Sequence, residues 1–342
     1  MLRNSMIESI GNTPLVKLRL EDRAIGNVYA KLEMLNPYGM KDRVAKQIIL
    51  EAKRSGILKD DAPIIESSSG TMALGVALVG TYLGHSVHIV TDPRMDMITM
   101  VKLQSLGCIV HVVERMTSQG WQSARLERLA ELLEASPGAF WPQQYENPNN
   151  PLAYAELARE LIDDIGRVDI LIGSVGSGGS LCGTARALRT QQAAPLRVIG
   201  LDAVGSFIFG QPDRPTRLQS GLGNSLIPAN VDFSVIDEVH WLSDEEAFAA
   251  THELVRHEKI FAGNSSGSTY AVARWLGQRV PAGTNIVAIF PDRGDRYFST
   301  FYNRDYLEQK GIQSLRIPEA PQHVQRDVIV NSWSYCHLHE GQ

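Results

Sequence analysis

The sequence predicts an α/β fold with two domains, in which mostly parallel, twisted sheets are flanked by helices. Short β-branched segments alternate with helical patterns along most of the chain, and this alternation is typical of parallel strands joined by crossover helices. The 342 residues, 44% hydrophobic and 21% charged, have an ordinary globular composition. At roughly 150 residues per domain, this length corresponds to about two domains.

The elements follow one another in a regular order. Strands are predicted at residues 28–33, 63–66, 86–90, 109–113, 169–172, 197–201, 238–242 and 285–290. Helices are predicted at residues 42–55, 72–83, 99–105, 120–133, 152–165, 180–191, 244–257 and 269–278. A Pro- and Asn-rich stretch at residues 137–151 interrupts the periodicity and indicates a domain junction. The tail after Ile312 is polar and has no clear period, so we expect an extension or a partner contact there and not core.

Charge and cysteine content exclude several classes of protein. The chain has 33 Lys+Arg against 38 Asp+Glu, a net charge of −5, which disfavours nucleic acid as a partner. Its three cysteines lie far apart and suggest neither a disulfide framework nor a metal site. The first twenty residues have no signal-like apolar core, and the most apolar stretch, at 73–84, is too short for a membrane span. We therefore expect a cytoplasmic protein with no membrane partner.

A turn that carries a lysine leads into the first long predicted helix. Residues 36–43 read NPYGMKDR. A lysine at such a turn can present its amine to a cleft, where desolvation would lower its pKa and permit Schiff-base chemistry. The alternative is that Lys41 is a solvated surface lysine, which is the common case.

A serine-rich loop connects the strand at 63–66 to the next helix. It contains Ser67, Ser68, Ser69 and Gly70, followed by Thr71. Hydroxyl groups and free backbone N–H groups at a helix N-terminus can bind a carboxylate or a phosphate. The alternative is a helix cap with spare serines, although three serines exceed what capping needs.

A glycine-rich loop follows the strand at 169–172 and opens a helix. Residues 173–180 read GSVGSGGS, and the N–H groups of such a loop can hold a phosphate against the positive end of the helix dipole. The dinucleotide pattern fails because Leu181 stands where it needs glycine, and the P-loop pattern fails because Gly179 stands where it needs lysine. The favoured ligand is a single cofactor phosphate, and the alternative is a tight strand-to-helix turn.

A fourth motif supports a competing enzyme class. Residues 263–267 read GNSSG and match the GxSxG nucleophile elbow, with Asp292 and His323 following in Ser–Asp–His order. A serine hydrolase that uses Ser265 is therefore a second hypothesis. His323, however, lies in the unpatterned tail.

Taken in order, these clusters resemble the pyridoxal-phosphate enzymes of the cysteine synthase and cystathionine β-synthase family, which have fold type II. Residues 11–15 (GNTPL) and 143–151 (QQYENPNNP) are similar to two further family motifs. The resemblance implies the cofactor pyridoxal 5'-phosphate, bound covalently to Lys41, the catalytic lysine. It assigns the phosphate cradle to five residues of the glycine loop: Gly176, Ser177, Gly178, Gly179 and Ser180.

The resemblance also assigns the rest of the site. Ser265 would face the pyridine nitrogen, and Thr71 would lie beside the cofactor 3'-oxygen. The expected substrate-binding residues are Ser68, Ser69, Gly70, Thr71, Gln144, Gly221 and Arg217. Arg217, together with Arg214, would meet a donor phosphate, because arginine binds phosphate bidentately.

Two departures mark a divergent branch of the family. Thr71 stands where the family has asparagine, and Met72 where it usually has threonine. Residues 202–210 and 291–297 resemble the S-sulfocysteine synthases and the enzymes that make a diaminopropionate precursor for siderophores. Members of both groups use O-phosphoserine as the donor.

The implied reaction is a β-replacement on an activated L-serine, O-phosphoserine or O-acetylserine, through an aminoacrylate. Its product would be cysteine or an analogue such as S-sulfocysteine. The alternative acceptor is an amine such as that of L-glutamate. The serine hydrolase and a catalytically inactive homologue are more remote alternatives.

The resemblance finally predicts a domain division and an assembly. Residues 1–40 with 150–310 would form the larger, cofactor-binding domain, and residues 41–149 a smaller, mobile substrate domain. Residues 311–342 would be a C-terminal extension. The expected partners are amino-acid substrates and a second copy of the chain, as a homodimer.

Overall fold

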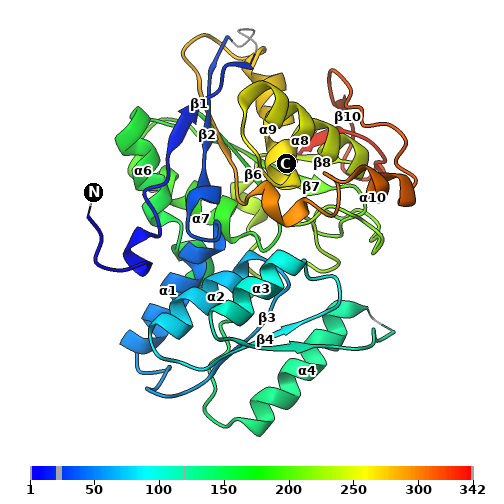
Figure 1. Cartoon of the computed structure of the whole chain (residues 1–342). Helices are drawn as coiled ribbons and strands as arrows, with labels where there is room; N and C mark the ends of the chain where they lie inside the picture. The colour runs from blue at the N-terminus through cyan, green and yellow to red at the C-terminus, as the bar shows by residue number, and fades with distance from the viewer. Residues whose placement is uncertain (1, 21–24, 119, 340–342) are drawn as a thin grey trace.

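The chain folds around two separate sheets. A computed structural model describes residues 2–20, 25–118 and 120–339, and within these ranges the strands form an eight-stranded and a three-stranded sheet. The two sheets occupy the upper and lower parts of the molecule in Figure 1. The predicted α/β class, with mostly parallel sheets flanked by helices, is confirmed.

The larger sheet combines strands from both ends of the chain. In spatial order its strands are β1 (Leu15–Lys17), β2 (Asn27–Lys31), β9 (Asn285–Ile289), β6 (Ile170–Ser174), β7 (Arg197–Ala203), β8 (Glu238–Leu242), β11 (Ser334–His337) and β10 (Gln322–His323). The five central strands, from β2 to β8, pair in parallel. Their carboxyl ends therefore meet along one edge of the sheet, which is where open α/β sheets bind ligands.

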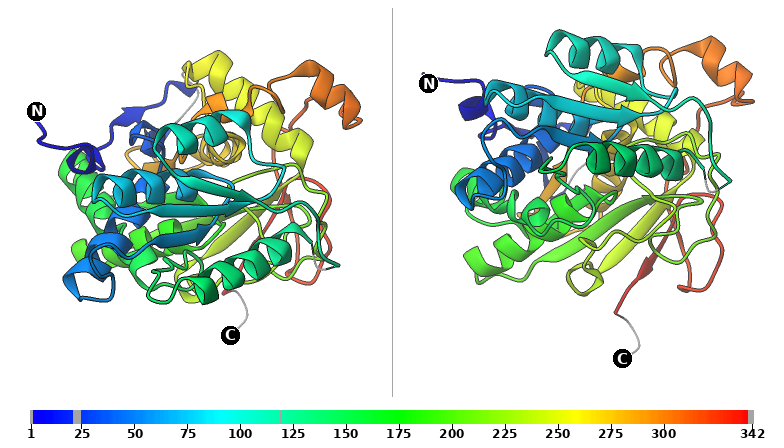
Figure 2. Two further views of the ribbon diagram at one scale, coloured as in Figure 1. Left: turned by 60° about the horizontal axis from the view of Figure 1, so that its bottom comes forward. Right: turned by 90° about the horizontal axis from the view of Figure 1, so that it is seen from below.

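The smaller sheet is purely parallel. Its strands are β3 (Ile64–Ser67), β4 (Val87–Thr91) and β5 (Ile109–Val112). Its helices are α1 (Lys41–Arg54), α2 (Thr71–Tyr82), α3 (Met97–Ser105) and α4 (Trp121–Ala135). Figures 1 and 2 show α1, α2 and α3 between this sheet and the rest of the molecule, with α4 on the other face. Helix α2 is apolar on all sides because it is buried on all sides, from Met72 to Gly80.

The remaining helices cover the larger sheet. They are α5 (Asn149–Leu152), α6 (Ala155–Ile165), α7 (Gly179–Gln191), α8 (Asp244–Glu258), α9 (Asn264–Gly277) and α10 (Arg304–Gln309). The helix predicted at 152–165 corresponds to α6 and begins at Ala155, because Leu152 is the last residue of the separate short helix α5. The helix predicted from residue 269 begins at Asn264, because tertiary burial of its serine-rich first turn outweighs the weak helix propensity of those residues.

The C-terminal tail differs from the expectation that it lies outside the core. Strand β11 pairs antiparallel with β8, and Trp333 and Cys336 are each 2% exposed. The indole Nε1 of Trp333 donates to Nδ1 of His240 at 3.1 Å, and its backbone N–H donates to Glu246 Oε1 at 2.9 Å. Apolar residues in the tail are too sparse to show a periodic pattern, so only tertiary contacts reveal this strand.

The sheet division fits the two predicted domains. The strands of the smaller sheet lie within residues 41–149, and those of the larger sheet lie outside that range. The domain boundaries themselves stay a prediction. Among the described residues, no helix combines the length and the apolarity needed to cross a membrane.

Candidate active site

Segments that are far apart in the sequence meet around one cavity of about 210 Å³. Its walls are formed by Met40, Lys41, Ser67, Ser68, Ser69, Gly70, Thr71, Met72, Arg125, Gln144, Tyr145, Gly176, Ser177, Ser220, Gly221, Leu222, Gly223, Asn224, Ser265, Pro291, Asp292 and Arg296. The structure thus brings together most of the predicted site residues. Gly178, Gly179 and Ser180 lie behind this lining, at the start of α7.

Lys41 is the first residue of α1. The backbone N–H of the preceding residue, Met40, donates to the carbonyl of Pro291 at 2.9 Å. Burial lowers the pKa of Lys41 to about 8, and the carboxylates of Asp292 and Glu33 oppose this shift only in part. An amine with such a pKa is substantially neutral near pH 8, so it can act as a nucleophile or a base.

The glycine loop forms an anion-binding cradle between β6 and α7. Gly178 is the N-cap of α7 and has φ +83°, and an added Cβ there would lie 2.7 Å from the backbone of Val231. At Gly179 an added Cβ would overlap the side-chain oxygen of Asn150. Within the described residues, no acceptor pairs with the backbone N–H groups of residues 176–180. These donors lie at the positive end of a 13-residue helix, which suits a phosphate group.

Ser265 lies in the first turn of α9 and is 1% exposed. Its Oγ lines the cavity and has no hydrogen-bond partner among the described residues. A buried hydroxyl left without a partner is costly and indicates a missing ligand atom. The hydroxyl can serve as a neutral partner for a ring nitrogen.

The serine hydrolase arrangement is not assembled around Ser265. Among the described residues, none of those lining the cavity is a histidine. His323 lies in β10 and packs its ring against Tyr335, 4.9 Å between centroids. Asp292 instead accepts hydrogen bonds from the hydroxyl of Tyr297 at 2.7 Å and from Arg296 at 3.1 Å.

The serine loop presents the N-terminus of α2 to the cavity. Gly70 is the N-cap of α2 and offers no side-chain cap, so the first N–H groups of the helix stay available for an anion. Arg125 from α4 donates through Nη1 to Ser69 Oγ at 3.1 Å, and its side chain is only 11% exposed. Arg125 was not predicted from the sequence, because an arginine on an amphipathic helix is expected to lie on the solvent-exposed face.

Comparison with known proteins decides the family. The family model described as "Pyridoxal-phosphate dependent enzyme" matches residues 6–292. The chain belongs to this family. The enzyme is 38% identical over 315 residues to N-(2-amino-2-carboxyethyl)-L-glutamate synthase of Cupriavidus metallidurans, covering 90% of this chain and 92% of the relative. It is 34% identical to a cysteine synthase of Helicobacter pylori, covering 87% of this chain and 98% of the relative.

A solved structure agrees with these relatives. The O-acetylserine dependent cystathionine β-synthase from Helicobacter pylori has a TM-score of 0.80 and 33% sequence identity, covering 88% of this chain and 98% of the other. The resemblance inferred from the sequence motifs is therefore confirmed at the level of the family and the fold.

The residues of the cavity fit pyridoxal phosphate. The unpaired N–H groups of the glycine loop suit its phosphate, the unpartnered Oγ of Ser265 suits its ring nitrogen, and the desolvated amine of Lys41 suits its aldehyde. Thr71, at the start of α2, supplies a hydroxyl to the same cavity in place of the family's asparagine. The pyridoxal-phosphate enzyme thus has a donor set for each polar group of its cofactor.

The lowered pKa of Lys41 has a measurable consequence. In the cofactor-free protein, the rate at which an acylating reagent modifies Lys41 is expected to rise about tenfold per pH unit below pH 8 and to level off above it, because only the neutral amine reacts. Peptide mapping after brief labelling at several pH values measures this rate. A midpoint near the ordinary lysine value, about 10.4, would contradict the assignment of a desolvated amine.

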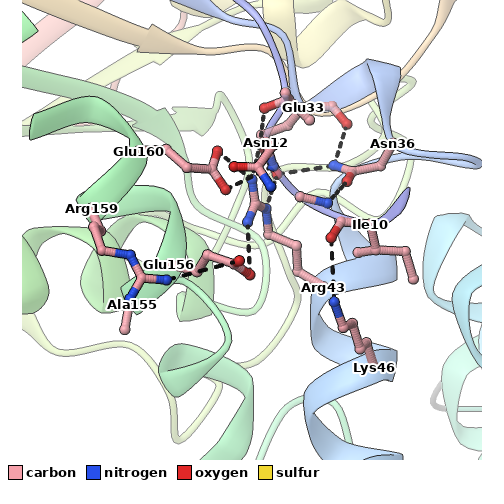
Figure 3. Close-up of polar contacts among 12 residues, drawn as sticks. Ile10, Asn12, Glu33, Asn36, Arg43, Lys46, Ala155, Glu156, Arg159 and Glu160 are labelled. Atoms are coloured by element: carbon pink, nitrogen blue, oxygen red, sulfur yellow. Dashed lines mark hydrogen bonds and ion pairs between the residues drawn. The ribbon is translucent and has the colours of Figure 1, made fainter. Parts of the chain in front are cut away.

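A buried network of charges fixes the helix that carries Lys41 (Figure 3). Arg43, two residues further along α1, donates to Glu33 at 2.7 Å and to Glu160 at 2.8 Å. Glu33 follows β2 and Glu160 lies on α6, and Lys31 pairs with the same Glu160 oxygen at 2.7 Å. The side chains of Arg43, Glu33 and Glu160 are 2%, 0% and 8% exposed. The network therefore ties the start of α1 to the larger sheet, which positions Lys41.

Breaking this network is expected to be costly. Arg43→Met should lower the free energy of unfolding by about 3–5 kcal/mol, because it leaves buried carboxylates without their partner. Urea unfolding of the cofactor-loaded enzyme measures the change. The matched control is Arg54→Met on the same helix, whose exposed pair with Glu51 should be dispensable. Equal stabilities of the two variants would argue against the positioning role of Arg43.

The structure places Arg217 and Arg214 outside the cavity of Lys41. Arg217 lines a second cavity next to it and donates to Asp213 and to the carbonyl of Gly205, both at 2.6 Å. Arg214 donates to Asn331 at 2.7 Å. Arg125 is instead the arginine that, with Arg296, lines the cavity itself.

Proposed function

We propose that the enzyme catalyses β-replacement on an activated L-serine. The observation that carries the proposal is the placement of a desolvated lysine amine in the same cavity as an anion-binding serine loop. The bound cofactor supplies an electron sink for the charge left at Cα when its proton is removed. Substrate binding, proton transfer and contact with the ring nitrogen are carried out by residues of this chain.

The proposed roles follow from position and charge. The hydroxyls of Ser68, Ser69 and Thr71, with the backbone N–H groups of Ser69 and Thr71 and the amide of Gln144, bind the substrate carboxylate. Lys41 takes the proton from Cα and returns it after the acceptor has added. Ser265 is a neutral partner for the ring nitrogen, so it does not hold that nitrogen protonated as a carboxylate would. This favours prompt loss of the β-substituent over racemisation.

For the donor we propose O-phosphoserine, because the guanidinium of Arg125 lines the cavity beside the serine loop. Arg125 contacts Ser69 of the serine loop, and arginine binds phosphate bidentately. Arg125→Met should lower kcat/KM for O-phosphoserine by about 10–100-fold, with a smaller loss for O-acetylserine. Arg128→Met is the control, since Arg128 lies on the same helix in an exposed pair with Glu131. Equal losses for the two donors would overturn this choice of donor.

For the product we propose cysteine or an analogue such as S-sulfocysteine, with an amine acceptor as the second candidate. The relatives support both, because one is named a cysteine synthase and another an N-(2-amino-2-carboxyethyl)-L-glutamate synthase. Wild-type enzyme with each donor and with sulfide, thiosulfate or L-glutamate, followed by mass spectrometry, tests the choice. Failure to release phosphate or acetate from either donor would contradict the proposed β-replacement and favour an inactive homologue.

We further propose a cytoplasmic homodimer that has no nucleic-acid partner. The proposal rests on the family resemblance for the dimer and on the net charge of −5 for the absence of nucleic acid. Light scattering of the purified enzyme at several concentrations measures the oligomeric state. A mass near 37.7 kDa at every concentration would contradict the dimer.

A further inference from the structure

A buried carboxyl group lies directly behind the serine loop. Glu66 lies in β3 and is 2% exposed. In this segment the lining of the Lys41 cavity begins one residue later, at Ser67. Burying a carboxyl group is costly unless hydrogen bonds compensate, so the partners of Glu66 indicate its role.

One oxygen of Glu66 holds two different segments of the chain. Its Oε1 accepts a hydrogen bond from the backbone N–H of Ser67 at 2.7 Å and another from the indole Nε1 of Trp141 at 3.2 Å. Burial raises the pKa of the Glu66 carboxyl to about 7, and hydrogen bonds from these two donors and from the backbone of Gln144 oppose the rise. Glu66 therefore joins the serine loop to the segment that contains Gln144, and these two segments supply the proposed carboxylate site.

Backbone pairing aligns the same two segments. The N–H of Ile65 donates to the carbonyl of Phe140 at 2.9 Å, and the N–H of Phe140 donates to the carbonyl of Pro63 at 2.8 Å. The chain at Phe140 thus runs beside β3 for a short distance. Beyond Phe140 the side chain of Glu66 continues this connection, through Trp141 and Gln144.

Gln144 is also fixed from the side of the glycine loop. Its carbonyl accepts hydrogen bonds from the side-chain Nδ2 atoms of Asn150 at 2.5 Å and of Asn230 at 3.2 Å. The same Nδ2 of Asn150, a fully buried residue, donates to Ser177 Oγ at 3.2 Å. A continuous path of hydrogen bonds therefore runs from the serine loop through Glu66, Gln144 and Asn150 to the glycine loop.

We propose that Glu66 is a positioning residue that holds the serine loop and Gln144 at the spacing which a substrate carboxylate needs. This inference rests on the carboxylate site of the proposed function. Through Asn150, the same path sets the distance between that site and the phosphate cradle. Because the cofactor phosphate and the substrate carboxylate must be bound at the same time, this distance bears on substrate affinity.

The test replaces Glu66 in cofactor-loaded, full-length enzyme. Glu66→Leu removes the acceptor from the buried position. Glu66→Gln keeps Oε1 as an acceptor, and its amide nitrogen would replace Oε2, which is buried and has no hydrogen-bond partner among the described residues. The matched control is Glu246→Leu. Glu246 is another buried carboxylate, which accepts from the backbone N–H groups of Ser243 at 2.8 Å and Trp333 at 2.9 Å and does not line the Lys41 cavity.

The probes are L-serine, which carries a carboxylate and no activated leaving group, and ethanolamine, which is L-serine without its carboxylate. The visible absorbance of the bound cofactor reports the binding of each amine. We expect Glu66→Leu to raise the dissociation constant for L-serine about tenfold or more and to leave that for ethanolamine within about twofold. Glu66→Gln should bind L-serine within about threefold of wild type. Glu246→Leu should lose stability in thermal unfolding and bind both probes as wild type does.

Equal losses of affinity for the two probes in Glu66→Leu would overturn the positioning role, and so would wild-type affinity for L-serine. If Glu66→Leu does not fold, Asn150→Ala tests the other end of the path. It should weaken the binding of L-serine and of pyridoxal phosphate together, and wild-type affinity for L-serine would again overturn the inference. Where wild type releases a leaving group, these results overturn the positioning role alone. With neither leaving-group release nor L-serine binding in wild type, the inference and the proposed function fail together.

Discussion

Lys41→Ala is expected to reduce turnover of activated serine by roughly 1,000-fold, within the range that loss of a general base causes. The physical reason is that Lys41 is both the covalent anchor suited to the cofactor and the only amine among the residues lining the cavity within the described parts of the chain. Steady-state release of phosphate or acetate measures the loss. Borohydride reduction followed by tryptic peptide mapping should fix the cofactor on the peptide of residues 32–43 in wild type, and on no peptide in the variant.

Although Lys41→Ala should reduce turnover, it should not reduce the stability of the folded protein. Since burial lowers the pKa of Lys41 to about 8, the folded state binds fewer protons than the unfolded state between pH 8 and the ordinary lysine value. Stability therefore rises with pH across that window, and below pH 8 the protonated, buried amine is fully destabilising. In the cofactor-free state, Lys41→Ala should be at least as stable as wild type at pH 7. Thermal unfolding then separates lost chemistry from lost structure.

The control for this experiment is Lys46→Ala. Lys46 lies on the same helix, and among the described residues its Nζ makes a single long contact, 3.4 Å, to the carbonyl of Ile10. This variant should keep wild-type turnover and wild-type cofactor attachment. Wild-type turnover in Lys41→Ala, or cofactor trapped on a different lysine of wild type, would remove Lys41 from the mechanism.

The motif-bearing part of the site could be predicted from the sequence for a physical reason. Lys41, the serine loop, the glycine loop and Ser265 each lie at a junction between elements, where loop residues are chosen for backbone geometry and not for packing. Their local sequences therefore carry a recognisable pattern. The glycine loop follows β6 of the larger sheet, the serine loop follows β3 of the smaller sheet, and Ser265 lies in α9, which follows α8, so their convergence on one cavity depends on tertiary packing.

Side chains that act across the fold could not be predicted. Arg125 reaches the cavity from the face of α4, so it has no local signature. Arg43 belongs to the lysine-bearing turn motif at residues 36–43, but its partner Glu160 lies 117 residues away. Long-range ion pairs produce no periodic pattern in the sequence. The buried strand β11 likewise has no local pattern, because its burial depends on pairing with the distant strand β8.

Gly178→Ala is expected to weaken cofactor binding by about 100-fold, the equivalent of losing roughly two charge-assisted hydrogen bonds of about 1.5 kcal/mol each. Gly178 has φ +83°, which costs an alanine about 1–2 kcal/mol, and the new Cβ would lie 2.7 Å from backbone atoms of Val231. To relieve this overlap, the loop must move, and its N–H groups would no longer converge on one phosphate. Titration of the cofactor-free variant with pyridoxal phosphate, followed by visible absorbance, measures the affinity.

Gly166→Ala separates backbone strain from loss of the cradle. Gly166 ends α6 with φ +75°, so alanine there meets a similar left-handed strain, but no atom lies within 4 Å of the added Cβ. This variant should lose some stability and keep its affinity for the cofactor. If Gly178→Ala instead bound the cofactor as tightly as Gly166→Ala, the phosphate would have to be held elsewhere. The unpaired N–H groups of residues 176–180 would then be without a ligand, and such an arrangement at the start of a helix is costly when buried.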